Sequence, residues 1–297
     1  MSHRFCTDLA IARGEPLEGT GAMAERHLFL AWPKGKWRRP RYQSVDMDEA
    51  LQAAMQGATG NGRYVGLIDR GEETEFRLWS FPDMRSVVAS SQAEAAALIA
   101  AWGDGTPLDG EALPRRVILC CTDAKIDSCC ARYGFPLYKA LRAQAAAHGF
   151  DVLQCTHIGG CHFAPSVIVM PQRHRYGRLT PAEVPALLET LADNRIYLSA
   201  FKGRPDLQPD GQLAEIAAMR WAEARGVSQA QVRIVETLAV EPGRCSVRLR
   251  VGDSDLLVRL RQQAFEVHGN CRDLDAGPGK MVDRWLLEQV QAPGESG

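Results

Sequence analysis

Long apolar runs are missing from this sequence of 297 residues, in which none approaches the roughly 18–20 residues that a membrane-spanning helix needs. The N-terminal stretch contains Arg13 and Glu15 but no apolar core of the kind found in a secretory signal peptide. Excess charge is missing too, because 35 lysines and arginines balance 36 aspartates and glutamates to a net charge of −1. Such a chain lacks the single-sign field that attracts nucleic acid or anionic lipid. We therefore expect a cytoplasmic protein with no nucleic-acid and no membrane partner.

Three catalytic signatures are also absent. The sequence has no Cys-x-x-Cys motif, which disfavours a thiol–disulfide oxidoreductase of the usual kind. It has no strand-linked Gly-x-Gly-x-x-Gly motif, so any electrons would have to arrive from a separate reductase. Nothing indicates the paired carboxylates of a glycosidase. The sequence thus carries none of the signatures of these three kinds of stand-alone enzyme.

Cysteine, by contrast, is plentiful: there are nine, and six of them lie between positions 120 and 161. An odd number without a signal peptide argues against a disulfide framework, so the clustering indicates metal ligation or redox chemistry. The simpler interpretation is that cysteine serves as a small buried hydrophobe. We prefer that interpretation for Cys120 and Cys155, which lie at strand ends, and for the isolated Cys6, Cys245 and Cys271. Cys271 could still approach the cysteine cluster from another domain.

Apolar periodicity predicts the same order of elements twice, in residues 27–102 and again in residues 117–191: strand, helix, strand, strand, helix. That order is the core of a thioredoxin-like fold. The first copy contains no cysteine, and we interpret it as a degenerate copy without a cofactor. The predicted class is therefore α/β, with a degenerate thioredoxin-like domain (1–112), a second thioredoxin-like domain (113–205) and a C-terminal α+β extension (206–297).

The individual elements follow from runs of apolar residues and from turn and cap signals. Gly149 is placed to end one helix, and Thr180 begins another with a capping box. The predicted helices are 46–55, 91–102, 136–148, 181–191 and 212–224, and the predicted strands are 27–32, 64–68, 76–81, 117–121, 152–155, 167–170, 176–179, 233–240, 246–251, 255–261 and 265–268.

Two loops carry the candidate metal-ligating residues. Cys121 ends one predicted strand, and Cys130 lies nine positions later, just before a predicted helix. His157 and Cys161 follow the next strand, with a flexible glycine pair between them. Because both loops leave the carboxyl ends of parallel strands, the four side chains can converge at one edge of the sheet. Two alternatives stay open, since Cys129 could replace Cys130 and His162 could replace Cys161.

The pattern of Cys, eight residues and Cys, followed by His-x-Gly-Gly-x and Phe163-Ala164, resembles the sucrase/ferredoxin-like family, whose members contain a thioredoxin-like ferredoxin domain. The resemblance extends over roughly residues 5–180. Further segments agree with it: Gly14-Glu15-Pro16-Leu17, Gly19-Thr20, Ala24-Glu25-Arg26 and Tyr176-Gly177-Arg178-Leu179.

The resemblance implies a [2Fe–2S] cluster. In eukaryotic members two cysteines and two histidines bind it, and these positions fall on Cys121, Cys130, His157 and residue 161. This chain has cysteine at position 161, so the implied set is three cysteines and one histidine. The implied function is electron transfer with a redox partner protein, either an external reductase or an acceptor, while the oligomeric state is not predicted.

The ligand types have an electrostatic consequence. A thiolate is negatively charged and a neutral imidazole is not, so His157 should make the cluster easier to reduce and its potential dependent on pH. The same donors also suit a structural zinc ion, although the Cys-x8-Cys spacing is longer than in typical zinc sites. Zinc binding and thiol–disulfide exchange remain the alternative functions.

Overall fold

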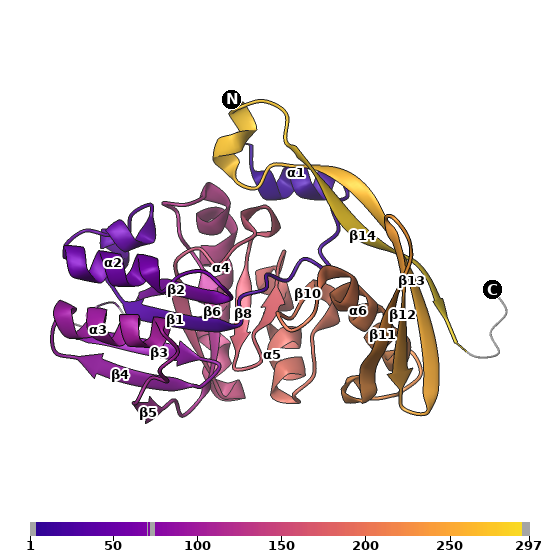
Figure 1. The fold of residues 1–297 in the computed structure, drawn as a ribbon, viewed down its shortest axis with the longest axis horizontal. Coiled ribbons are helices and arrows are strands. Elements are labelled where there is room, and N and C mark those ends of the chain that lie inside the picture. Colours follow the sequence, from indigo (N-terminus) through magenta and orange to yellow (C-terminus); the bar gives the residue numbers. More distant parts are fainter. Residues whose placement is uncertain (1–3, 70, 72–74, 293–297) are drawn as a thin grey trace.

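The protein is described here by a computed structural model covering residues 4–69, 71 and 75–292. In this part of the chain the strands form two sheets, one of ten strands in the order β10-β9-β8-β6-β7-β2-β1-β3-β4-β5 and one of four in the order β11-β12-β13-β14 (Figure 1). The predicted α/β class is confirmed. No helix among the described residues is long and apolar enough to cross a membrane.

The first half of the large sheet follows the N-terminal helix α1 (Cys6–Ala12). Its core is a hairpin and a βαβ unit: β1 pairs in parallel with β2 and antiparallel with β3, and β3 pairs antiparallel with β4. Side-chain caps begin α2 and α3. The Asp48 side chain accepts a hydrogen bond from the Leu51 N–H at 2.8 Å, and the Ser91 side chain accepts one from the Glu94 N–H at 3.2 Å. The elements are β1 (Arg26–Ala31), α2 (Glu49–Gly57), β2 (Arg63–Asp69), β3 (Phe76–Phe81), β4 (Arg85–Ala89), α3 (Gln92–Gly103) and the short β5 (Glu111–Ala112).

The second half repeats this topology strand for strand. β6 is parallel to β7 and antiparallel to β8, and β8 is antiparallel to β9. Three strands of the large sheet were not predicted, because their apolar runs are too short to stand out: β4, β5 and β10 (Phe201–Gly203). The elements are β6 (Arg116–Cys121), α4 (Ser128–Gln144), β7 (Phe150–Cys155), β8 (Val167–Met170), β9 (His174–Tyr176), α5 (Val184–Ala192) and β10 (Phe201–Gly203).

Helix α4 begins earlier than predicted, at Ser128 rather than at residue 136. The Asp127 side chain accepts a hydrogen bond from the Cys129 N–H at 2.8 Å and so caps the helix. Pro136, the first residue of the predicted helix, lies inside the observed helix. As a consequence Cys129 and Cys130 occupy the first helical turn and not a loop. The helix passes into a 3-10 turn that ends at Gly149 in the left-handed conformation, as predicted.

The C-terminal segment packs α6 (Pro209–Glu223) against a four-stranded meander, β11 (Val232–Glu241), β12 (Arg244–Val251), β13 (Ser254–Val267) and β14 (Lys280–Gln291). Their shared core includes Leu213, Ala217, Val247 and Val258. The two strands predicted over 255–261 and 265–268 are a single strand, and β14 was not predicted. The domain boundaries at 112/113 and 205/206 stay a prediction.

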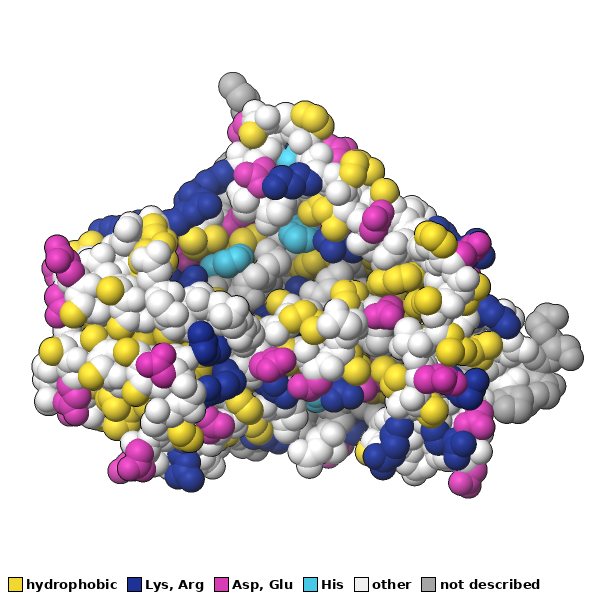
Figure 2. Space-filling model, in the orientation of Figure 1, with side chains coloured by type: hydrophobic (Ala, Val, Ile, Leu, Met, Phe, Trp, Pro, Cys, Tyr) yellow, Lys and Arg dark blue, Asp and Glu magenta, His cyan; other side chains and the backbone are white. Residues whose placement is uncertain are grey.

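The last two strands extend beyond β12 as a two-stranded arm, defined here as residues 262–284. The arm crosses over α1 (Figure 1) and carries the 3-10 helix Cys271–Asp275 near its tip. Ion pairs fix it there, with Arg13 to Glu266 at 2.9 Å and Arg284 to Glu15 at 2.7 Å. Below it the surface is hollowed, and histidine side chains (cyan) are visible in the hollow (Figure 2).

Candidate metal centre

Four predicted ligands meet at the carboxyl ends of β6 and β7. Cys121 ends β6, Cys130 lies in the first turn of α4, and His157 and Cys161 belong to the loop after β7. The ligand atoms of Cys121, Cys130 and His157 all lie within 4.8 Å of one another. The Cys161 Sγ adjoins this group, 3.8 Å from the Cys130 Sγ and 3.2 Å from the His157 Nδ1. The predicted convergence at one sheet edge is therefore present.

The cysteines of the centre are buried, whereas its histidine is partly exposed. Cys121, Cys130 and Cys161 are each at most 2% exposed, whereas His157 is only half-buried. Burial strengthens electrostatic interactions among these groups because little water screens them. His157 is thus the member of the set that faces solvent.

Hydrogen bonding within the group favours two thiolates. The Cys130 thiol, the main cause, and then His157 lower the pKa of Cys121 to about 6, although burial opposes this. The same two neighbours, Cys130 first, lower the pKa of Cys161. Burial disfavours the charged form of His157, but its contacts with Cys121 and Cys161 outweigh that effect and raise its pKa to about 10. Metal binding requires deprotonated thiols, and this environment promotes them at Cys121 and Cys161, whereas the hydrogen bonds with these two residues and burial raise the pKa of Cys130.

Strands from both halves of the large sheet donate hydrogen bonds to the loop that carries His157. The Tyr64 hydroxyl of β2 donates to the His157 carbonyl, and Arg175 of β9 donates to the Ile158 carbonyl at 3.0 Å. Gly159 and Gly160 have φ values of 94° and 70°, the left-handed conformations that the glycine pair predicts. The cysteine-free first half therefore supports the centre through Tyr64.

The alternative ligand Cys129 points away from this group. Adjacent helical residues project about 100° apart, which separates it from Cys130. Its Sγ lies 3.4 Å from the Cys6 Sγ and 3.2 Å from the Cys271 Sγ. The structure thus brings Cys130 to the centre, and not Cys129.

The alternative ligand His162 also faces elsewhere. Its Nε2 lies 3.4 Å from the Glu15 Oε1, and its Nδ1 lies 3.4 Å from the Gly269 carbonyl oxygen of the arm. It borders a cavity of about 560 Å³ beneath the arm, together with His268 and Arg284. These contacts assign His162 to the junction with the arm.

The remaining cysteines divide into two kinds. Cys120, Cys155 and Cys245 are buried among apolar neighbours, as expected, and burial raises the pKa of each. Cys6 and Cys271 differ from the expectation of isolated hydrophobes, since both contact Cys129. No spacing signal could have revealed this, because the three residues are 123 to 265 positions apart.

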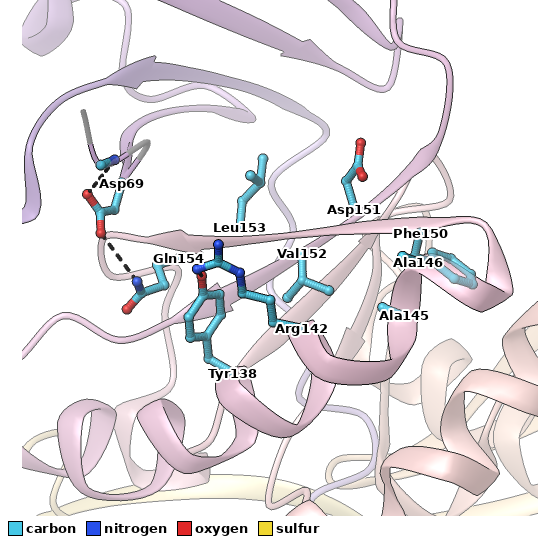
Figure 3. A pocket seen from close by; sticks show the side chains of 11 residues that line it. Asp69, Tyr138, Arg142, Ala145, Ala146, Phe150, Asp151, Val152, Leu153 and Gln154 are labelled. Carbon is cyan, nitrogen blue, oxygen red and sulfur yellow. Dashed lines mark hydrogen bonds between the residues drawn. The ribbon is translucent and has the colours of Figure 1, made fainter. Parts of the chain in front are cut away.

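A second cleft, of about 520 Å³, lies along β7 away from the centre, and no cysteine lines it. Tyr138 and Arg142 of α4 lie beside Gln154 there (Figure 3), and Gln154 donates to Asp69 at 3.2 Å. The cleft borders the junction of the two half-sheets, where β2 and β7 share two residue pairs among the described residues. None of the four candidate ligands lines this cleft.

Gly134 fixes the approach of α4 to β6. A Cβ at this position would overlap the carbonyl oxygen of Cys121, so only glycine allows the helix to pack this closely beside the ligand. We expect Gly134→Ala to destabilise the protein by about 1–3 kcal/mol, because helix or strand must shift. Thermal unfolding should show a loss of several degrees in Tm.

Gly57→Ala is the matched control for that substitution. Gly57 ends α2, and a Cβ there meets nothing within 4 Å. Alanine favours the helix over glycine by up to about 1 kcal/mol, so the control should unfold at the same temperature or higher. An unchanged Tm in Gly134→Ala would contradict the proposed close packing.

Comparison with known proteins gives one family. The model of the sucrase/ferredoxin-like family matches residues 17–203, more than half of the chain. No curated protein matches. Among solved structures, the thioredoxin-like [2Fe-2S] ferredoxin from Aquifex aeolicus is 16% identical, with a TM-score of 0.28 over 30% of this chain and 92% of that one. A cysteine-to-serine variant of that ferredoxin is 17% identical, with a TM-score of 0.26 over 29% and 96%. From the extent of the family match, this chain belongs to the sucrase/ferredoxin-like family.

Proposed function

We propose that the chain binds one [2Fe–2S] cluster through Cys121, Cys130, His157 and Cys161 and serves as an electron carrier. The observation that carries this proposal is the convergence of three thiols and one imidazole in a buried pocket at the end of two parallel strands. Thiolate and imidazole are the protein ligands found on [2Fe–2S] clusters. The donor set therefore fits the group that the family implies.

A bound cluster would supply reversible one-electron chemistry, and the residues around it would set its potential and access. The three buried cysteines exclude water on one side. His157 replaces a charged thiolate with a neutral ring, so the site is less negative than an all-cysteine one. Since His157 is also the half-buried member, we propose that a redox partner protein docks on its face.

Zinc is the second candidate for this centre. The compactness of the Cys121, Cys130 and His157 group, with all ligand atoms within 4.8 Å, would also suit a single tetrahedral ion. A zinc site would be colourless and redox-inactive, so the two candidates are separable by spectroscopy.

Reversible bleaching tests the proposed function. We expect anaerobically purified protein to be reddish, to contain two irons and two sulfides per chain, and to lose its visible absorption with dithionite and regain it with ferricyanide. Colourless protein with stoichiometric zinc would contradict the proposal. So would insulin reduction by the metal-free protein at the rate of an active thiol–disulfide oxidoreductase.

A further inference from the structure

A second group of ligands lies on the other side of the α4 N-terminus. It unites Cys6 at the start of α1, Asp127 and Cys129 at the start of α4, and Cys271 on the arm. All four ligand atoms lie within 4.8 Å of one another. The three Sγ atoms form a triangle with sides of 3.2, 3.4 and 3.6 Å. None of these residues belongs to the proposed cluster site.

The group is buried and closed. Cys6, Cys129 and Asp127 are at most 2% exposed, and Cys271, on the arm, is half-buried. Asp127 is held in place, because its Oδ2 accepts the Cys271 N–H at 2.8 Å while its Oδ1 accepts the Cys129 N–H. The same Oδ2 lies 3.8 Å from the Cys6 Sγ, which places a carboxylate oxygen next to the sulfur triangle.

Donors directed at the sulfur atoms prepare this group for ligation. The Cys6 N–H donates to the Cys271 Sγ at 3.4 Å. Cys129 occupies the first turn of α4, where the helix dipole and free N–H groups stabilise a thiolate.

We propose that Cys6, Cys129, Cys271 and Asp127 bind one zinc ion. Four tetrahedral ligands with Zn–S bonds near 2.3 Å place sulfurs about 3.8 Å apart, so the observed triangle needs to open only slightly. Three thiolates and one carboxylate belong to the ligands that zinc accepts, whereas iron–sulfur clusters are held by cysteine or histidine. Four protein ligands leave no open position, so the ion is structural.

Such an ion would join three segments that are distant in sequence. Cys6 and Cys271 are 265 positions apart, and Cys129 lies between them in the helix that also presents Cys130. The ion would therefore fasten α1 and the arm to the same helical turn that carries a proposed cluster ligand.

X-ray absorption at the zinc edge of the intact holoprotein, expressed with added zinc, tests this site without a mutation. We expect one zinc per chain beyond any iron, with three sulfurs at about 2.3 Å and one oxygen at about 2.0 Å. Absence of stoichiometric zinc would overturn the proposal. A nitrogen-containing shell at a stoichiometry of one zinc per chain would do the same, because it would locate that single ion at His157, and so would a disulfide between Cys129 and Cys271 in a non-reducing peptide map.

Matched variants separate this site from the cluster site. Cys6→Ser and Cys271→Ser should each remove one zinc per chain and leave iron and visible absorption unchanged, while Cys245→Ser should keep both metals. If zinc instead occupies both centres, each of the first two variants should drop from two zinc ions to one, which would disprove the iron–sulfur function but support this site. Retention of full zinc in Cys271→Ser would overturn the second site itself.

Discussion

Replacing Cys130 with serine should remove the bound iron, whereas replacing its neighbour Cys129 should leave iron in place. The two residues are adjacent, but their Sγ atoms belong to different groups, one with Cys161 and one with Cys6 and Cys271. Changes to residues that merely orient a metal ligand already cost about 10–100-fold in affinity, so loss of a direct ligand should reduce iron content at least about ten-fold. Iron and sulfide assays with visible spectra of both variants measure the effect.

Zinc content supplies the reciprocal readout for the same pair. Cys129→Ser should lose zinc and keep iron, and Cys130→Ser should show the opposite. The reverse result, with iron lost only in Cys129→Ser, would mean that Cys129 is the cluster ligand and that the orientation of the first turn of α4 is misassigned.

Replacing His157 with cysteine should lower the midpoint potential of the cluster by on the order of 100 mV or more. The substitution adds a negative charge to a buried site, and all-cysteine [2Fe–2S] centres have potentials several hundred millivolts below histidine-ligated ones. The variant should still bind iron, because thiolate is an ordinary ligand for the cluster. Potentiometric titration followed by visible absorption measures the shift.

The pH dependence of that potential provides an internal check. A reduced cluster makes its imidazole ligand more basic, so the wild-type potential should fall as pH rises between about 6 and 9, whereas His157→Cys should be nearly flat. His148→Cys, at the distant end of the 3-10 turn after α4, is the control and should match the wild type. An unchanged potential in His157→Cys would exclude His157 as a ligand.

The loops of the candidate centre could be predicted from sequence because their signals are local. Cys121 ends an apolar strand, and the glycine pair before Cys161 permits the positive φ angles that it adopts. The matching order of elements in residues 27–102 and 117–191 likewise reflects short-range periodicity, and the structure shows equal strand topology in both.

The start of α4 could not be predicted as easily, because two helix-start signals compete there. Proline is favoured in the first turn of a helix and disfavoured further in, so Pro136 indicated a start near residue 136. The Asp127 cap decides the start instead, and Pro136 lies within the helix that it begins. The cap is visible in the sequence, but aspartate is also common in loops. Only the hydrogen bond that its side chain accepts from the Cys129 N–H identifies Asp127 as the cap of α4.

The second ligand group was beyond sequence reasoning altogether. Cys6, Cys129 and Cys271 share no motif, and their contact depends on how the arm crosses α1. The arm itself was hidden, because β13 reads as two short strands and β14 carries few strongly apolar runs. Long-range packing, rather than local propensity, creates that site.

Pulsed EPR of the dithionite-reduced holoprotein, prepared with natural and with ¹⁵N-labelled histidine, tests the proposed centre most directly. We expect a half-spin signal from a reduced [2Fe–2S] cluster with a strong nitrogen coupling that changes on labelling and disappears in His157→Cys. A reduced protein without such a signal, or a signal without coupling to histidine nitrogen, would contradict a cluster held by Cys121, Cys130, His157 and Cys161.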